Sequence, residues 1–291
     1  MHFVKAKSLL SQRNGMNLYR GCSHGCVYCD SRSACYQFTH PFEDIEVKEN
    51  APELLEEILR KRRKKCVIST GSMSDPYQPC EKELRLTRRC LEVIKRYGFG
   101  ASVITKSDLV LRDLDLFDRI NRGAKSVLQM TLTIADDAMS RLLEPGVCTT
   151  TRRVAVLKEF QRTGIPTVVW MTPILPFLTD TEENLRRILD YCFDAGVKGI
   201  ICFGAGLTLR DGNREYYYGA LDRLFPGLRG RYEQIYGNAY EVNSPQSGAL
   251  MEIFHRECGR RGVLHDPDEC FRYIAAMPEE NPQLSLFDSL G

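Results

Sequence analysis

Three cysteines near the start of the chain, Cys22, Cys26 and Cys29, are the residues whose type and spacing point most clearly to chemistry. Thiolates separated by four and three residues can close on one inorganic cluster from a single short loop. Cysteine thiolate is the usual protein ligand of iron–sulfur clusters, and a complete [4Fe–4S] set takes four. Three local ligands would leave one iron open for a substrate or cofactor, as catalytic zinc sites keep one position open.

The same loop has two simpler interpretations. With His24 the three cysteines match a structural zinc site, because zinc accepts both ligand types. They also match unligated buried cysteines, which pack as small hydrophobic side chains. The loop alone favours the iron–sulfur cluster and does not exclude the structural zinc site.

The composition is that of a well-cored globular protein. The chain has 291 residues, of which 43% are hydrophobic and 27% charged, and its formal net charge is +2. This length suits one large α/β barrel, and the small net charge says nothing for or against nucleic acid. Twelve cysteines without a secretory signal favour a reducing compartment over a disulfide framework. No apolar run approaches the roughly 20 residues that cross a bilayer, so we expect a cytoplasmic protein with no membrane partner.

Strand and helix patterns alternate after the cysteine loop. Buried strands are predicted at residues 66–70, 101–105, 126–132, 167–171 and 199–203. Helices are predicted at residues 52–59, 83–97, 112–121, 151–163 and 182–195. Such alternation indicates βαβ units and a parallel sheet. With the segment before the cysteine loop it predicts an α/β fold, a partial (β/α)6 barrel of the TIM type, with its chemistry at the C-terminal ends of the strands.

Four segments are predicted along the chain. Residues 1–15 form an N-terminal segment along the surface, and residues 16–210 form the barrel. Residues 211–277 form a C-terminal extension packed on the barrel, with helices near 247–261 and 266–276. Residues 278–291, which contain Pro278 and Pro282, are expected to be a flexible tail.

Polar residues recur at the exits of the predicted strands. The second strand leads into Gly71-Ser72-Met73-Ser74-Asp75-Pro76-Tyr77, the third into Lys106, and the fourth into Thr133 and Glu144. Each signal is weak alone, but their recurrence at one face of a barrel beside the cysteines indicates a site. Together with the C-x3-C-x2-C spacing and Tyr28, they resemble the spore photoproduct lyase-like branch of the radical S-adenosylmethionine (SAM) superfamily over about residues 15–210.

The resemblance implies a [4Fe–4S] cluster on the three cysteines, with SAM bound at the open iron. The positions that fall where this family contacts SAM are Tyr28, Ser74, Lys106 and Thr133. Lys106 would pair with the carboxylate or ribose region of SAM. The implied reaction is reductive cleavage of SAM to a 5′-deoxyadenosyl radical that abstracts hydrogen from a substrate. The implied electron donor is a low-potential ferredoxin or flavodoxin.

One position departs from the family pattern. Spore photoproduct lyase carries a hydrogen-donating cysteine where this chain has Ser72, and a serine O–H bond is too strong to replace that thiol. Cys80 in the same strand-exit loop is a candidate thiol donor, and the alternative is that Cys80 is a small buried residue.

The substrate is left open by these residues. A nucleic-acid substrate is suggested by the family and by the sequence from Gln283 to Phe287, which resembles the bacterial sliding-clamp binding motif. Basic residues such as Arg152 and Arg153 are available for phosphate contacts but are scattered. The alternatives are a radical SAM enzyme acting on a peptide or small metabolite, and a zinc-stabilised binding protein without catalysis.

Overall fold

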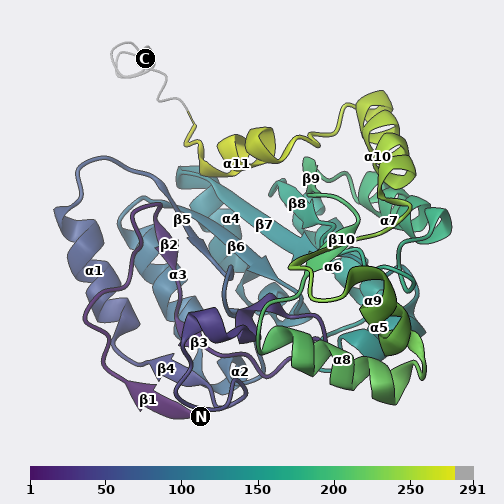
Figure 1. Ribbon diagram of the computed structural model, residues 1–291. Helices are drawn as coiled ribbons and strands as arrows, with labels where there is room; N and C mark the ends of the chain where they lie inside the picture. The colour runs from purple at the N-terminus through teal and green to yellow at the C-terminus, as the bar shows by residue number, and fades with distance from the viewer. Residues whose placement is uncertain (279–291) are drawn as a thin grey trace, which may run out of the picture.

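The centre of the fold is a six-stranded parallel sheet in the order β2-β5-β6-β7-β8-β9 (Figure 1). The structure is a computed structural model that describes residues 1–278. Its strands are β2 (Gly15–Met16), β5 (Val67–Thr70), β6 (Gly100–Thr105), β7 (Ser126–Thr131), β8 (Thr167–Trp170) and β9 (Gly199–Ile201). Each strand pairs with the next of these six along the chain, and β2 and β9 are not paired with each other. The predicted partial (β/α)6 barrel is therefore confirmed.

Helices connect the strands and cover the outside of the sheet. The first group is α1 (Ala51–Lys61), α2 (Glu81–Leu84), α3 (Leu86–Arg96), α4 (Leu114–Gly123), α5 (Asp137–Leu143), α6 (Thr150–Arg162) and α7 (Glu182–Asp194). Every residue of β7 is buried, as expected for a parallel strand covered on both faces. Buried positions therefore run along the whole length of β7, and its polar side chains Ser126, Gln129 and Thr131 are buried with the apolar ones.

The helix predicted at residues 83–97 is two helices in the structure. Arg85 adopts a left-handed conformation (φ 49°) between α2 and α3. The carboxylate of Glu81 accepts the backbone N–H of Thr87 at 3.0 Å and so satisfies one of the free donors at the start of α3. A side chain outside the helix thus sets its first turn, and helical periodicity carries no signal for that contact.

Residues 212–240, for which the residue pattern predicts no elements, contain two helices. They are α8 (Asn213–Leu224) and α9 (Leu228–Tyr236), joined by tyrosine packing. Tyr217 and Tyr232 are buried with their hydroxyls 3.0 Å apart, and the Tyr232 hydroxyl donates to the Pro176 carbonyl at 2.7 Å. Aromatic residues have modest helix propensity, so tertiary contacts stabilise these helices.

Two small sheets flank the barrel. In the first, β1 (His2–Val4) pairs in parallel with β4 (Glu46–Lys48), which also pairs with β3 (Tyr19–Arg20). In the second, β10 (Gly206–Thr208) and β11 (Glu241–Asn243) form an antiparallel pair. The start of the predicted surface segment 1–15 is therefore a strand, because β4 offers it a free edge.

The last two helices of the described residues are α10 (Ser247–Arg261) and α11 (Pro267–Ala275), close to the ranges predicted for them. Leu264, between them, bridges Gly199 of β9, and the Ile200 N–H donates to its carbonyl at 2.8 Å. In the structure α10 contacts α7, and α11 contacts β9. Among residues 1–278, no helix has both the length and the apolar character that crossing a bilayer requires.

Candidate active site

The three cysteines lie on the loop that follows β3, and glycines shape this loop. Gly21 has φ +88°, and a Cβ there would lie 2.4 Å from the Phe42 carbonyl oxygen. Gly25 has φ +70°. A side chain at Gly21 would force the loop away from its neighbour, so the local path needs glycine.

The cysteine loop covers a cavity of about 230 Å³ at the C-terminal ends of the strands. All three cysteines line it, together with residues that follow β5, β6 and β8. The lining residues from the strand exits include Ser74, Asp75, Thr105, Lys106 and Thr172. Residues far apart in the sequence thus converge at the face where barrel enzymes place their chemistry.

The cavity fits a cluster better than a single zinc ion. Around one tetrahedral zinc, thiolate sulfurs stand about 3.8 Å apart, given Zn–S bonds of about 2.3 Å. The three cysteines and His24 do not form a described group whose ligand atoms all lie within 4.8 Å of one another. His24 is buried and lines the cavity, and neither of its ring nitrogens has a hydrogen-bond partner. An unpartnered buried imidazole beside three separated thiols fits a site whose occupant is larger than one ion.

Burial also sets the charge state of the thiols. Burial, with a contribution from Asp75, raises the pKa of Cys22 to about 12, and burial raises the pKa of Cys26 as well. Only thiolates ligate iron, so positive charge has to offset this burial. Cationic irons in the cavity would provide it.

A buried ion pair contacts the cysteine loop through Tyr28. Arg153 and Glu144 pair with both side chains fully buried, and the Tyr28 hydroxyl donates to the same carboxylate. Arg153 also donates to the Thr131 carbonyl at 2.8 Å. Burial alone would raise the pKa of Glu144, but Arg153 and then Lys106 lower it overall, so Glu144 carries a charge.

Asp75 fixes the position of Lys106. Its carboxylate accepts the Lys106 N–H at 2.8 Å and the Thr105 hydroxyl at 2.7 Å. Burial opposes the charge of Lys106, but Cys26 and Glu144 raise its pKa overall. Lys106 is therefore a cation held at the cavity wall by its backbone.

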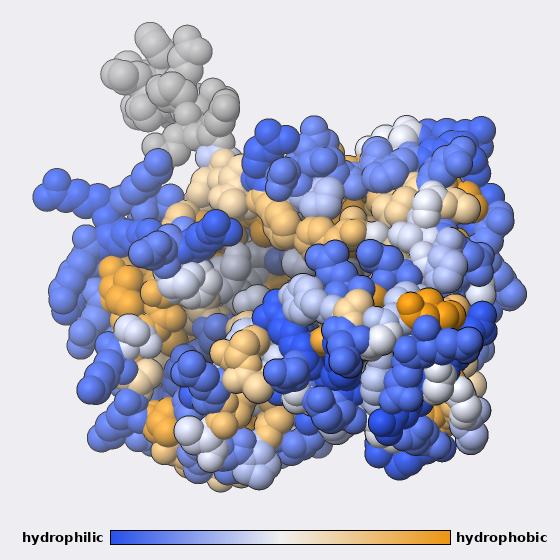
Figure 2. Space-filling view, viewed as in Figure 1, coloured by the Kyte–Doolittle hydropathy of each residue, from blue (hydrophilic) through white to orange (hydrophobic). Residues whose placement is uncertain are grey.

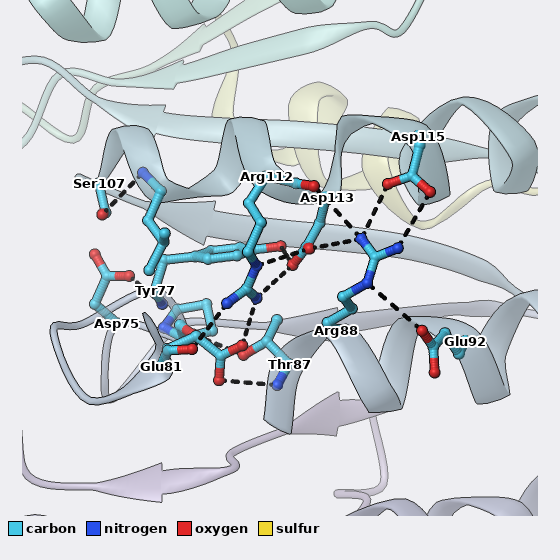
Figure 3. A network of polar contacts seen from close by, with 12 residues as sticks. Asp75, Tyr77, Glu81, Thr87, Arg88, Glu92, Ser107, Arg112, Asp113 and Asp115 are labelled. Atoms are coloured by element: carbon cyan, nitrogen blue, oxygen red, sulfur yellow. Dashed lines mark hydrogen bonds and ion pairs between the residues drawn. The ribbon is translucent and has the colours of Figure 1, made fainter. Parts of the chain in front are cut away.

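The loop that carries Asp75 is itself anchored by the polar network in Figure 3. The Tyr77 hydroxyl donates to Asp113 at 2.9 Å, and Arg112 bridges Asp113 and Glu81 at 2.7 and 2.6 Å. Both carboxylates are fully buried. The network joins the segment after β5 to the segment after β6 and so fixes the positions of these two loops relative to each other.

A second cavity of about 700 Å³ adjoins the first. The two share five lining residues, namely Cys26, Cys29, Lys106, Trp170 and Thr172. Residues of β10 and β11 line its far side, including Asn243. Figure 2 shows this face of the molecule hollowed near its middle, over the central strands. The small cavity lined by the three cysteines thus adjoins a space large enough for a cofactor and part of a substrate.

The predicted site residues are distributed unequally around the two cavities. Ser74 lines the smaller cavity, Tyr28 lines the larger one, and Lys106 lines both. Thr133 lines neither, and its buried hydroxyl has no hydrogen-bond partner. Cys80 also lines neither. It lies at the start of α2, half-buried against the main core, and burial raises its pKa to about 11. The roles of these residues remain predictions.

Sequence reasoning misses several residues of the site. It groups Arg153 with scattered basic residues, whereas Arg153 is buried and paired. Arg152 forms an ion pair with Asp108 at 2.8 Å. Trp170 is predicted only as part of a strand, yet it lines both cavities, and its indole N–H donates to Gln129 at 2.7 Å. For Glu144 the available signal is its position at a predicted strand exit.

Comparison with known proteins agrees with this arrangement. Residues 16–192 match the model of the radical SAM superfamily. An uncharacterized protein of Mycobacterium bovis is 31% identical over 252 residues, covering 81% of this chain and 73% of the relative. An uncharacterized protein of Methanocaldococcus jannaschii is 35% identical over 171 residues, covering 57% of this chain and 62% of the relative.

Solved structures with the same fold include spore photoproduct lyase. A mutant of that enzyme with bound AdoMet and dinucleoside spore photoproduct has a TM-score of 0.62 and 14% identity, covering 86% of this chain and 74% of the other. Another of its mutants has a TM-score of 0.62 and 16% identity, covering 90% and 80%. With three cysteines at one cavity on the C-terminal face of a partial barrel, and a superfamily match over most of that barrel, the chain belongs to the radical SAM superfamily.

Proposed function

We propose that the protein is a radical SAM enzyme that holds a [4Fe–4S] cluster on Cys22, Cys26 and Cys29 and binds SAM beside it. The observation that carries this proposal is the joining of the two cavities, because the chamber of the cysteines shares Cys26, Cys29 and Lys106 with the larger space. A cofactor in the shared region would touch both the cysteine loop and the substrate.

With cluster and SAM bound, one electron from a low-potential donor would break the C5′–S bond of SAM, giving methionine and a 5′-deoxyadenosyl radical for hydrogen abstraction. The residues of the chain would bind and orient the cofactor and the substrate, and they would exclude water from the site. Lys106 presents a cation suited to a carboxylate, since charge-assisted hydrogen bonds are the stronger kind. Trp170 and Leu207 supply apolar walls to the larger cavity.

For the substrate we favour a nucleotide-containing molecule. Spore photoproduct lyase, which shares the fold, was solved with a dinucleoside. Phe203 lines the larger cavity and is 61% exposed, with its ring 6.1 Å from that of Trp170, so an aromatic surface for base stacking lies at the site. Ser72 in place of a thiol argues against thymine-dimer repair by hydrogen donation from that position. A peptide or small metabolite is the alternative substrate class.

The test of the enzyme class is anaerobic purification and reconstitution, followed by an assay for 5′-deoxyadenosine from SAM with dithionite as reductant. Wild-type protein is expected to show cluster absorbance and to form 5′-deoxyadenosine. Cys26→Ala is expected to lose both, whereas Cys35→Ala, at an exposed cysteine, should retain them. A colourless zinc protein that leaves SAM intact would overturn the proposal and favour the zinc-stabilised binding protein.

The substrate class needs a separate test. Turnover of candidate oligonucleotides and peptides with deuterated SAM, read by mass spectrometry, would show which one exchanges hydrogen with the cofactor. Two further predictions depend on the substrate: Cys80 is a thiol donor, and a sliding clamp is a partner. The clamp motif, Gln283 to Phe287, lies outside the described residues.

A further inference from the structure

Two histidines and a glutamate gather at the N-terminal strand, apart from the cysteine site. His2 on β1, His40 and Glu46 on β4 each offer one ligand atom, and these atoms all lie within 4.8 Å of one another. Within residues 1–278 this is the one group of three or more His, Cys, Asp or Glu side chains that meets this spacing. Figure 1 shows β1 and β4 side by side near the N-terminus.

Strand pairing brings the first two ligands together. His2 and Glu46 are register partners in the parallel pair β1–β4, so both side chains point to the same face. His40 then packs edge-to-face on His2, with ring centroids 4.8 Å apart. Its Nε2 lies 3.9 Å from the Glu46 carboxylate, and the two side chains are 13% and 19% exposed. Most of the solvent that would otherwise hydrate this carboxylate is therefore excluded.

Each of the two imidazoles has its Nδ1 atom in a polar contact. Nδ1 of His2 lies 3.0 Å from the Asp44 carboxylate, which also pairs with the Met1 amine at 2.6 Å. Nδ1 of His40 lies 3.0 Å from the Pro41 carbonyl, and a carbonyl can only accept, so this nitrogen carries the proton. Nε2 of His40 is then a buried acceptor, and it has no hydrogen-bond partner. Metal-ligating histidines show this arrangement, with one nitrogen donating to a carboxylate or carbonyl and the other free for the metal.

We propose that His2, His40 and Glu46 bind a zinc ion. Two imidazole nitrogens and one carboxylate oxygen are common zinc ligands, and around tetrahedral zinc such atoms stand about 3.3 Å apart. The 3.9 Å between His40 and Glu46 is close to that value, so small side-chain movements complete the site. Three protein ligands leave the fourth position to water. The ion would join β1 to β4 and to the segment that returns from the cysteine loop.

The test is zinc binding by the full-length, anaerobically reconstituted protein, whose cluster content is measured first so that the cysteines are accounted for. Zinc is titrated in competition with a colorimetric chelator. Wild-type protein is expected to bind one zinc ion outside the cluster. His2→Gln, His40→Gln and Glu46→Gln should each weaken zinc binding about tenfold or more. Replacing even a residue that only supports a metal ligand typically lowers metal affinity about 10- to 100-fold. His255→Gln, at an exposed histidine on α10, should bind as wild type does.

A second measurement separates lost binding from lost folding. Zinc should raise the unfolding temperature of the wild type and of His255→Gln, and leave that of His2→Gln and His40→Gln unchanged. His2 is 40% exposed, so its replacement should leave the zinc-free unfolding temperature intact. Absence of zinc binding outside the cluster, or equal affinity in the wild type, His2→Gln and His40→Gln, would overturn the proposal. Neither measurement depends on the formation of 5′-deoxyadenosine, so the zinc site is tested separately from the proposed enzyme class.

Discussion

At the residue scale, the candidate site depends on charges that are buried together. Glu144 and Arg153 are both fully buried, and the carboxylate also accepts from the Tyr28 hydroxyl. Taking one charge from such a pair leaves the other without compensation in a medium of low dielectric constant. Lys106 lies close enough to Glu144 for each to favour the charged form of the other. The wall of the cavity is therefore one coupled electrostatic unit.

Glu144→Gln should lower the free energy of unfolding by roughly 3–5 kcal/mol, because it leaves Arg153 buried and unpaired. Glu159→Gln, which breaks an exposed ion pair with Arg162, should change it by less than about 1 kcal/mol. Chemical denaturation at pH 7 measures both. Equal stabilities of the two variants would show that the buried pair contributes no more than an exposed one.

The same pair makes a prediction about acid stability. The folded-state pKa of Glu144 is lowered, so its contribution is present above the unfolded-state value of about 4.3 and is lost as the pH falls through the folded value. Wild-type protein should therefore lose more stability than Glu144→Gln between about pH 5 and the acid limit of the measurement. Parallel stability curves for the two proteins over this range would contradict the prediction.

Lys106→Met tests the assigned role of this lysine. A charge-assisted hydrogen bond to a ligand contributes about 1.5–3 kcal/mol, so the dissociation constant for SAM should rise about 10- to 100-fold. Equilibrium dialysis of SAM against reconstituted protein measures it, and iron and sulfide contents show whether the cluster is retained. Lys82→Met, at an exposed lysine on α2, is the matched control and should bind SAM normally.

At the element scale, the cysteine loop is held by the turn between α5 and α6. The Val27 N–H donates to the Leu143 carbonyl at 2.9 Å, and the Gly146 N–H donates to the His24 carbonyl at 2.8 Å. A Cβ at Gly146 would lie 2.5 Å from that same His24 oxygen. The close approach of two backbones therefore requires glycine at this position.

Gly146→Ala should push the cysteine loop away from the turn and lower both stability and cluster retention. Overpacking of this kind costs about 1–3 kcal/mol. Thermal unfolding and iron content after reconstitution measure the two effects. Gly123→Ala, near the end of α4 where a Cβ would meet nothing within 4 Å, should be neutral or slightly stabilising. Full iron content in Gly146→Ala would show that the loop tolerates the displacement.

At the scale of the whole molecule, the C-terminal helices cover part of the open barrel. Cys270 and Ile274 of α11 are buried against Val127, Val168 and Ile201 of the sheet. Leu264 extends the hydrogen bonding of β9 at its free edge. An open barrel exposes apolar strand residues and an unpaired edge, and α10 and α11 cover part of both.

Ile274→Ala should therefore destabilise the protein by about 2–5 kcal/mol, the usual cost of this truncation in a core. Ile235→Ala is the same change at a residue that is 49% exposed, and should shift stability by less than about 0.5 kcal/mol. Denaturation midpoints compare the two. A small effect at Ile274 would show that α11 is attached only loosely to the sheet.

The order of residues is enough to predict the class of fold and the face of the barrel at which the candidate site lies. Strand patterns such as that of residues 126–132 and helical periodicity are local signals, and their alternation admits few topologies. The cysteine spacing is local as well, so Cys22, Cys26 and Cys29 can be predicted as cluster ligands from the order of residues alone. Lys106 and Ser74 follow because the exits of parallel strands meet at one edge of a sheet.

Contacts between residues distant in the sequence depend on the three-dimensional packing. The pairing of Arg153 with Glu144, the break at Arg85 and the approach of Gly146 to His24 each depend on contacts between segments that are separate in the sequence. The gathering of His2, His40 and Glu46 depends in the same way on strand register. Periodicity reports which face of an element is buried, whereas the partner of a buried charge is fixed by packing in three dimensions.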